Sequence, residues 1–351
     1  MRLIPPPAPP VIVITQKSCS TPSPSALAAA VFRWTWRRAA AVVAAVVAIA
    51  AVDNWCICVF VAYLDSSQPT NQLTNQYTTK PLHRIHTMTS PQKVLTIAGS
   101  DSGGAAGLQA DLKTLTALGV YGMSAVTAVT AQNSISVDEI TWMSPQFLAA
   151  QLDAVLSDYG ADAVKTGFLG KPELIIATSA KLQKYRPRHI IIDPVLVNHL
   201  GQPMFSPEIT DLYRSYLLPL ATIITPNRHE AALLTNSSLP ESVDLPQLRG
   251  LAKALYRRSH RPILIKGGRN KTMVVDILFD GERFTHIEAE LIDTTNTHGA
   301  GDTLSAAICA YLATGEDLET AVRHAHTFTH DAIKRAKDWQ LGAGHGPLAH
   351  F

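Results

Sequence analysis

The chain has 351 residues, of which 46% are hydrophobic and 17% are charged, with a formal net charge of +2. This much apolar surface excludes a disordered or low-complexity chain, because it is enough to bury a core. The near-neutral charge gives no reason to expect a nucleic-acid-binding protein, which would carry a strong basic excess.

Residues 1–88 differ in composition from the rest of the chain. They contain seven basic residues, two acidic residues and three of the four cysteines. An unbroken apolar run of 14 residues covers 39–52, and a second run covers 55–64. We expect this N-terminal extension to lie outside the folded domain, which then spans 89–351. Because only Cys309 lies in that domain, it cannot contain an internal disulfide, which fits a reducing compartment such as the cytoplasm.

Three interpretations of the extension remain open. Residues 39–64 are together long enough to span a membrane if Asp53 is tolerated there. The extension is also Ser-rich and poor in acids, as organelle-targeting segments are, but its Ala/Val run is too hydrophobic for an amphipathic presequence. The third interpretation, which we favour, is upstream sequence without a fold and a functional start near Met88.

Residues 89–351 alternate short apolar segments with amphipathic ones. In chain order we predict a strand at 93–98, a helix at 108–118, a strand at 125–129, a helix at 145–157, a strand at 163–166, a helix at 173–185, strands at 189–193 and 222–225, a helix at 245–259, a strand at 262–266, a hairpin at 273–279 and 284–289, and helices at 300–312 and 318–336. This order predicts an α/β fold with a mostly parallel central sheet and helices on both faces.

Polar clusters follow the carboxyl ends of the predicted strands, where ligands bind in sheets of this kind. They are Gly99–Gly107, Lys165–Gly170, Asp193, Thr225–Glu230 and Lys266–Gly268. The first cluster is not a dinucleotide or P-loop fingerprint, because its glycine spacing matches neither motif. By itself it is equally consistent with a tight turn and with a binding loop.

A second glycine cluster precedes the predicted helix at 300–312. Gly299, Ala300 and Gly301 would present free amides at the helix N-terminus, where the macrodipole adds positive potential. Such a nest suits a transferring phosphoryl group, and Asp302 is placed to accept a proton from an attacking hydroxyl. The alternative is an ordinary acidic N-terminal residue behind a glycine turn.

Asn227 and Glu230 lie three residues apart after the predicted strand at 222–225. Their oxygens form a pair suited to a water-rich Mg²⁺ site. Asn227 could equally cap a following helix, and both roles could hold together.

These motifs, in this order, resemble the hydroxymethylpyrimidine/phosphomethylpyrimidine kinases of thiamine biosynthesis, within the ribokinase-like superfamily. The resemblance covers about 93–351 and none of the extension. The segments that carry it are 98–104, 106–114, 129–133, 164–170, 193–195, 224–227, 265–268, 296–299 and 344–347. It implies a ribokinase-like fold, ATP and Mg²⁺ as cofactors, a homodimer, and phosphorylation of 4-amino-5-hydroxymethyl-2-methylpyrimidine and then of its monophosphate.

The resemblance also implies roles for single residues. Gln132 would bind the aminopyrimidine through a paired hydrogen bond, because an amide carries an adjacent donor and acceptor. Asp111 and Gly99 would lie beside it. Lys266 would lie near the nucleotide, together with the pair Asn227 and Glu230.

For the reaction itself, the resemblance implies that Asp302 is the base. The amides of Gly299–Gly301 would hold the transferring group.

Two positions depart from the family pattern. Asp302 stands where the family usually has Cys, in the form that sugar and pyridoxal kinases of the superfamily share. His199 stands where the family usually has Lys, and histidine is only partly charged near pH 7. A pyridoxal kinase is therefore the nearest alternative, although Gln132 and the segment Gly344–Pro347 favour the pyrimidine enzyme. A non-catalytic pyrimidine sensor is a third hypothesis, and the intact Asp302 opposes it.

Overall fold

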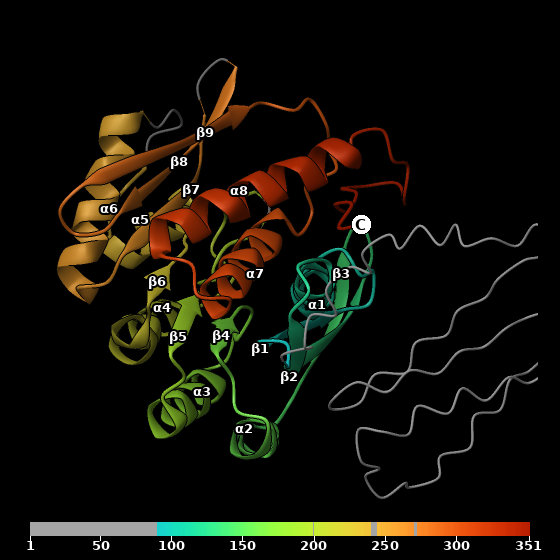
Figure 1. Ribbon diagram of the computed structural model, residues 1–351, viewed down its shortest axis with the longest axis vertical. Coiled ribbons are helices and arrows are strands. Elements are labelled where there is room, and N and C mark those ends of the chain that lie inside the picture. Colours follow the sequence, from blue (N-terminus) through green and yellow to red (C-terminus); the bar gives the residue numbers. More distant parts are fainter. Residues whose placement is uncertain (1–89, 199, 240–243, 270–271) are drawn as a thin grey trace, which may run out of the picture. The chain divides into compact units, whose positions relative to one another are not determined.

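The computed structural model describes residues 90–198, 200–239, 244–269 and 272–351 (Figure 1). The predictions for residues 1–88, including the hydrophobic segment 39–64, and the departure at His199 lie outside the described residues. No helix within the described ranges is long and apolar enough to cross a membrane.

One mostly parallel sheet runs through the described part of the chain in the order β3-β2-β1-β4-β5-β6-β7-β8-β9. Strands β2, β1, β4, β5, β6 and β7 pair in parallel, whereas β3, β8 and β9 pair antiparallel at the two edges. The strands are β1 (Lys93–Asp101), β2 (Tyr121–Gln132), β3 (Val137–Trp142), β4 (Ala163–Thr166), β5 (His189–Ile192), β6 (Ile223–Ile224), β7 (Ile263–Arg269), β8 (Met273–Phe279) and β9 (Phe284–Glu290).

Helices cover both faces of this sheet, as Figure 1 shows. The α-helices are α1 (Gly107–Ala117), α2 (Pro145–Asp158), α3 (Pro172–Tyr185), α4 (Pro207–Leu212), α5 (Arg228–Thr235), α6 (Leu245–Ser259), α7 (Ala300–Ala313) and α8 (Leu318–Arg335). A π-helical turn (Tyr213–Leu217) and a 3₁₀ turn (Leu218–Leu220) follow α4.

The core divides into two layers because successive strand residues point to opposite faces. On β1, Leu95 belongs to the core layer that includes residues of α2, α3, α5 and α6, whereas its neighbour Val94 belongs to the layer that includes residues of α1, α7 and α8. Ile190 and Ile191 on β5 divide in the same way. The apolar strands are therefore buried on both faces, as the parallel-sheet prediction requires.

The predicted elements are confirmed with small shifts at their ends, while β3, α4 and α5 are not among them. Strand β3 is exposed along almost its whole length, so its sequence lacks the apolar pattern that identifies a buried strand. Strand β2 begins at Tyr121, four residues before the predicted start. Gly122 and Ser124 interrupt the apolar run there, and this hides the first part of the strand from a hydrophobicity pattern.

Candidate active site

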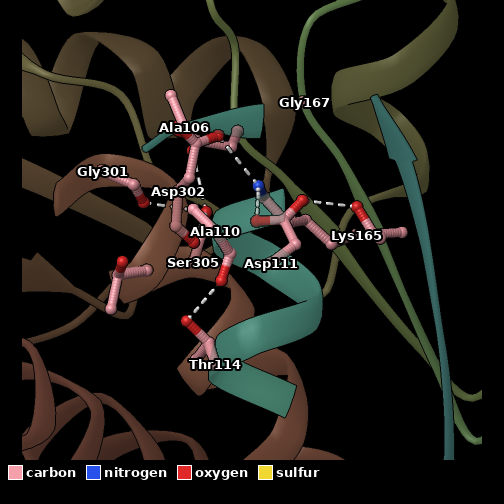
Figure 2. A network of polar contacts seen from close by, with 12 residues as sticks. Ala106, Ala110, Asp111, Thr114, Lys165, Gly167, Gly301, Asp302 and Ser305 are labelled. Atoms are coloured by element: carbon pink, nitrogen blue, oxygen red, sulfur yellow. Dashed lines mark hydrogen bonds and ion pairs between the residues drawn. The ribbon is translucent and has the colours of Figure 1, made fainter. Parts of the chain in front are cut away.

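A buried lysine lies between two carboxyl groups at the carboxyl edge of the sheet (Figure 2). The Nζ of Lys165, on β4, is 2.5 Å from Oδ1 of Asp111 on α1 and 3.2 Å from Oδ1 of Asp302 on α7. The side chains of Lys165 and Asp111 are fully buried, whereas that of Asp302 is 17% exposed. Thr96 donates its hydroxyl to Oδ2 of Asp111 at 2.5 Å. Among these three charged groups, only Asp302 opens toward solvent.

The surroundings of Asp302 favour its ionised form. Burial alone would raise the pKa of this carboxyl, but Lys165, the backbone N–H of Gly107 and Lys266 more than offset that effect and lower the pKa. Burial would likewise lower the pKa of Lys165, yet Asp111 and Asp302 outweigh it and raise the pKa. Near neutral pH, Asp302 is therefore a carboxylate that can accept a proton.

Asp111 differs from Asp302 in its charge. Burial raises the pKa of Asp111 to about 7, with Lys165 opposing the rise and Asp302 adding to it. Two carboxyl groups next to one ammonium cannot both ionise at low cost. Asp111 is therefore the member of the cluster that takes up a proton near neutral pH.

A second, largely buried ion pair lies beside the first cluster. Nζ of Lys266, on β7, is 2.7 Å from Oδ1 of Asp193, just after β5. Thr225 and Ser305 donate their hydroxyls to the two oxygens of Asp193 at 3.1 Å and 2.8 Å. A Cβ placed on Gly301 would lie 3.2 Å from Nζ of Lys266, so this ammonium sits against the first turn of α7.

Asn227 and Glu230 form a capping box at the start of α5. Oδ1 of Asn227 accepts the backbone N–H groups of His229 and Glu230 at 2.9 Å and 3.0 Å. The Glu230 carboxylate accepts the backbone N–H of Asn227 at 2.8 Å and that of Leu196 at 3.2 Å. The capping role expected as an alternative for Asn227 is confirmed. The metal role of the pair stays a prediction.

Burial also affects the charge of Glu230. It raises the pKa of Glu230 to about 7, against the attraction of Lys266 and with the repulsion of Asp193. Asp193 and Glu230 are thus two buried carboxyl groups that both attract Lys266. Such a pair fits a divalent cation, and Mg²⁺ commonly uses one or two carboxylates together with substrate phosphates. Within the described residues, no group of three or more His, Cys, Asp or Glu is arranged around a common metal position.

The glycine cluster before α7 forms a close contact with the loop after β1. Gly299 has φ +84°, and a Cβ there would lie 1.9 Å from the carbonyl oxygen of Ala105. Only glycine allows this approach. The amide of Ala300 donates to the carbonyl of Thr297 at 3.1 Å, so the prediction of three free amides is wrong for Ala300. Gly301 is the second residue of α7, where a helical amide has no acceptor within the helix.

The loop Gly99–Gly107 is held from inside by a residue that the sequence did not single out. Asp101 accepts the backbone N–H groups of Gly103, Ala105 and Ala106, each at 2.8 Å. These amides are satisfied by the loop's own carboxylate, so the tight-turn interpretation describes this part of the loop. The loop still reaches the site, because Gly107 donates to Asp302.

Gln132 ends β2 and faces the residue that precedes Gly299. Its Nε2 lies 3.0 Å from Nε2 of His298, and its Oε1 accepts the hydroxyl of Thr130 at 3.2 Å. His298 is also 3.9 Å from Oδ2 of Asp101. The predicted substrate residue is therefore tied to the predicted phosphoryl nest through His298.

The structure brings the predicted residues together on one edge of the sheet. Asp111 and Asp302 share Lys165, and Lys266 lies against Gly301. A Cβ on Gly107 would lie 2.4 Å from the carbonyl oxygen of Gly99, so Gly99 lies close to the start of α1.

Sequence reasoning placed Lys165 and Asp193 at the ligand-binding edge of the sheet but gave neither a role in the site. It did not single out Asp101 or His298. A lysine inside the apolar strand 163–166 was the signal that could have identified Lys165, because an unpaired lysine is rarely fully buried.

The chain is similar to several known proteins. A model of the phosphomethylpyrimidine kinase family matches residues 101–349. The thiamine biosynthesis bifunctional protein ThiED of Geobacter sulfurreducens is 45% identical over 259 residues, which are 74% of this chain and 52% of that protein. The chain thus spans about half the length of this relative. The hydroxymethylpyrimidine/phosphomethylpyrimidine kinase of Rhizobium meliloti is 43% identical over 258 residues, 73% of this chain and 96% of that enzyme.

Among solved structures, the ADP complex of Bacillus subtilis pyridoxal kinase superposes with a TM-score of 0.69 at 37% identity. The match covers 74% of this chain and 98% of that one. The predicted ribokinase-like fold is confirmed.

Proposed function

The chain belongs to the phosphomethylpyrimidine kinase family, and from this premise we propose that it transfers the γ-phosphoryl group of ATP to 4-amino-5-hydroxymethyl-2-methylpyrimidine and then to the resulting monophosphate. The observation that carries the proposal is the ionised, partly exposed Asp302 at the start of α7, held by Lys165 and beside a glycine turn. A carboxylate next to helix amides combines a proton acceptor with a site for negative charge. A protein that only senses a pyrimidine has no use for such a base.

In the first transfer, the Asp302 carboxylate takes the proton of the substrate's hydroxymethyl group. The hydroxyl oxygen forms a bond to the γ-phosphorus, the bond from that phosphorus to the bridging oxygen breaks, and ADP leaves. The amide of Gly301 and the ammonium of Lys266 lie together at the start of α7. They stabilise the negative charge on the transferring group.

Glu230 and Asp193 are the carboxylates that would hold Mg²⁺ beside the nucleotide phosphates. Asn227 keeps Glu230 in place through the capping box. When bound, the cation neutralises charge on the phosphates.

The substrate ring would lie beside Gln132, near Asp111 and Gly99. An aminopyrimidine offers an amino donor next to a ring nitrogen acceptor, which matches a carboxamide. His298 and Thr130 fix the orientation of the Gln132 amide. The side chain of Asp111 is fully buried, with one oxygen on Lys165 and the other on Thr96, so a direct contact with the ring requires this cluster to open.

Pyridoxal is the second candidate substrate. Asp302 in place of the usual Cys and the likeness to the Bacillus subtilis pyridoxal kinase favour it. Gln132, which would pair with the pyrimidine edge, favours the first proposal.

The test is ATP-dependent product formation by the full chain, followed by mass, with the hydroxymethylpyrimidine as substrate. We expect the monophosphate first and the diphosphate later. No phosphorylated pyrimidine from a folded, ATP-binding protein would refute the proposal. A reaction without ATP is the control.

The remaining proposals concern the whole protein. We propose that residues 89–351 are the kinase domain, that the protein is a homodimer, and that it works in the cytoplasm. Sedimentation of the purified chain tests the dimer. A fluorescent fusion with and without residues 1–88 tests localisation, and organelle or membrane signal that requires the extension would overturn the cytoplasmic assignment.

A further inference from the structure

Lys165 has two carboxylate partners where one would neutralise its charge. It is fully buried, it lies within hydrogen-bonding distance of both Asp111 and Asp302, and the two carboxyl groups come from different helices, α1 and α7. A buried ammonium with a single carboxylate is already neutral as a pair. The second carboxylate leaves the cluster with one negative charge, unless a proton binds to it.

We propose that Lys165 is a positioning residue that keeps Asp302 ionised and aimed at the acceptor hydroxyl, and that it transmits the charge of Asp111 to that base. This inference rests on the proposed function, because it assigns a role in the same phosphoryl transfer. When Asp111 is neutral, Asp302 is the one ionised carboxylate of this pair that the ammonium of Lys165 stabilises. When Asp111 is ionised, the two carboxylates compete for it.

Other charged groups also act on this cluster. Asp193, after β5, attracts Lys165, and Lys266, on β7, attracts Asp302. Cys309, on α7, interacts electrostatically with Lys165 and Asp111, and its burial raises the pKa of its thiol far above neutral pH, so it stays uncharged. Lys266 is paired with Asp193 at 2.7 Å, whereas Lys165 contacts Asp302 directly. Lys165 is therefore the cation with the stronger effect on the base.

The two phosphoryl acceptors differ in their need for a base. Comparing them distinguishes an effect of Lys165 on Asp302 from a general loss of structure. A hydroxymethyl group must lose its proton to attack phosphorus, whereas a phosphate monoester is already mostly ionised near neutral pH. Removing Lys165 raises the pKa of Asp302 and so slows the first transfer. The second transfer, whose acceptor needs no base, should change much less.

The experiment uses the full chain with Lys165→Met, Asp302→Asn, the double variant and Asp111→Asn. For Lys165→Met we expect kcat of the first transfer to fall about tenfold or more at pH 7. The acid limb of its pH profile should move to higher pH, and KM for ATP should stay within about twofold, since Lys266 remains. In the Asp302→Asn background, Lys165→Met should have little further effect on the first transfer. The inference would be overturned if Lys165→Met lowered kcat equally in both transfers. It would also be overturned if Lys165→Met lowered kcat of the first transfer equally in the original protein and in Asp302→Asn.

Asp111→Asn is an isosteric substitution that should shift the pKa of Asp302 in the opposite direction from Lys165→Met. It also tests the inference if Lys165→Met fails to fold. It removes the competing carboxylate, so the pKa of Asp302 should fall and the acid limb should move to lower pH. Titration of ¹³C-labelled Asp carboxyls, assigned with Asp302→Asn, measures the pKa of Asp302 without substrate. An unchanged pKa in Asp111→Asn contradicts the inference. A shifted pKa in a protein that phosphorylates no pyrimidine contradicts the proposed function alone.

Discussion

At the scale of single residues, the sequence identified candidate reactive and ligand-binding residues. It did not identify the side chains that position them. Asp302 and Lys266 follow glycine turns or strand ends, so local patterns singled them out. Lys165 contacts Asp302 across 137 residues of sequence. No local pattern reports that contact, because it exists only once β4 and α7 are packed together.

The base assignment predicts that Asp302→Asn affects the two transfers unequally. The amide cannot accept the hydroxyl proton, so we expect the first transfer to slow by about 10²- to 10⁴-fold. The second transfer should slow far less, because its phosphate acceptor carries no proton that must be removed. Rapid-quench rates with each acceptor measure both effects. An equal loss with the two acceptors would contradict a base role for Asp302.

The buried Glu230 predicts a pH dependence of stability. Its pKa is raised in the folded protein to about 7 from an ordinary value of 4.5. The folded state therefore binds the proton more tightly than the unfolded state, and Glu230 lowers the free energy of unfolding as pH rises from about 4.5 to above 7. We expect Glu230→Gln to lose less stability across this range than the original protein does.

Urea unfolding at several pH values measures this difference. Glu288→Gln is the matched control, because Glu288 is an exposed residue on β9. A wild-type slope retained in Glu230→Gln would show that Glu230 ionises normally.

At the scale of elements, the longer helices and the buried strands were predictable, whereas the exposed strand β3 and the short helices α4 and α5 were not. Ser144 and Asp244 cap α2 and α6 through hydrogen bonds that sequence rules describe, and both helices begin where they were predicted. Strand β3 presents Asp138 and Glu139 on an exposed edge, so its pairing with β2 decides its conformation. Sequence periodicity carries no information about such a partner.

The junction between α7 and the loop after β1 predicts the effect of Gly299→Ala. A Cβ would lie 1.9 Å from the carbonyl oxygen of Ala105 at a residue with φ +84°, so the helix start and the loop must separate. We expect stability to fall by about 2 kcal/mol or more and the kcat of phosphoryl transfer to fall with it.

Gly315→Ala is the matched control for this substitution. Gly315 follows the other end of α7 and has φ +97°, but nothing lies within 4 Å of its Cβ position. It should cost only about 1 kcal/mol from backbone strain and leave kcat unchanged. Equal effects of the two substitutions on kcat would mean that the contact with Ala105 does not shape the site.

At the scale of the whole molecule, the parallel order of the central strands explains why distant motifs form one site. Residues that follow β1, β4, β5, β6 and β7 all leave the sheet at its carboxyl edge, where α1 and α7 also begin. The fold class and the clustering were therefore predictable from the alternation of elements. The pairing inside the cluster was not, because it depends on which side chains of β4, α1 and α7 meet on one face of the sheet.

The central claim is that this site phosphorylates a pyrimidine alcohol in spite of its aspartate base. The most direct measurement is kcat/KM of the full chain for the hydroxymethylpyrimidine and for pyridoxal, each with saturating ATP. We predict a preference for the pyrimidine of about tenfold or more, because Gln132 matches its donor and acceptor edge. A preference for pyridoxal would contradict the account and would make Asp302 the mark of a different substrate.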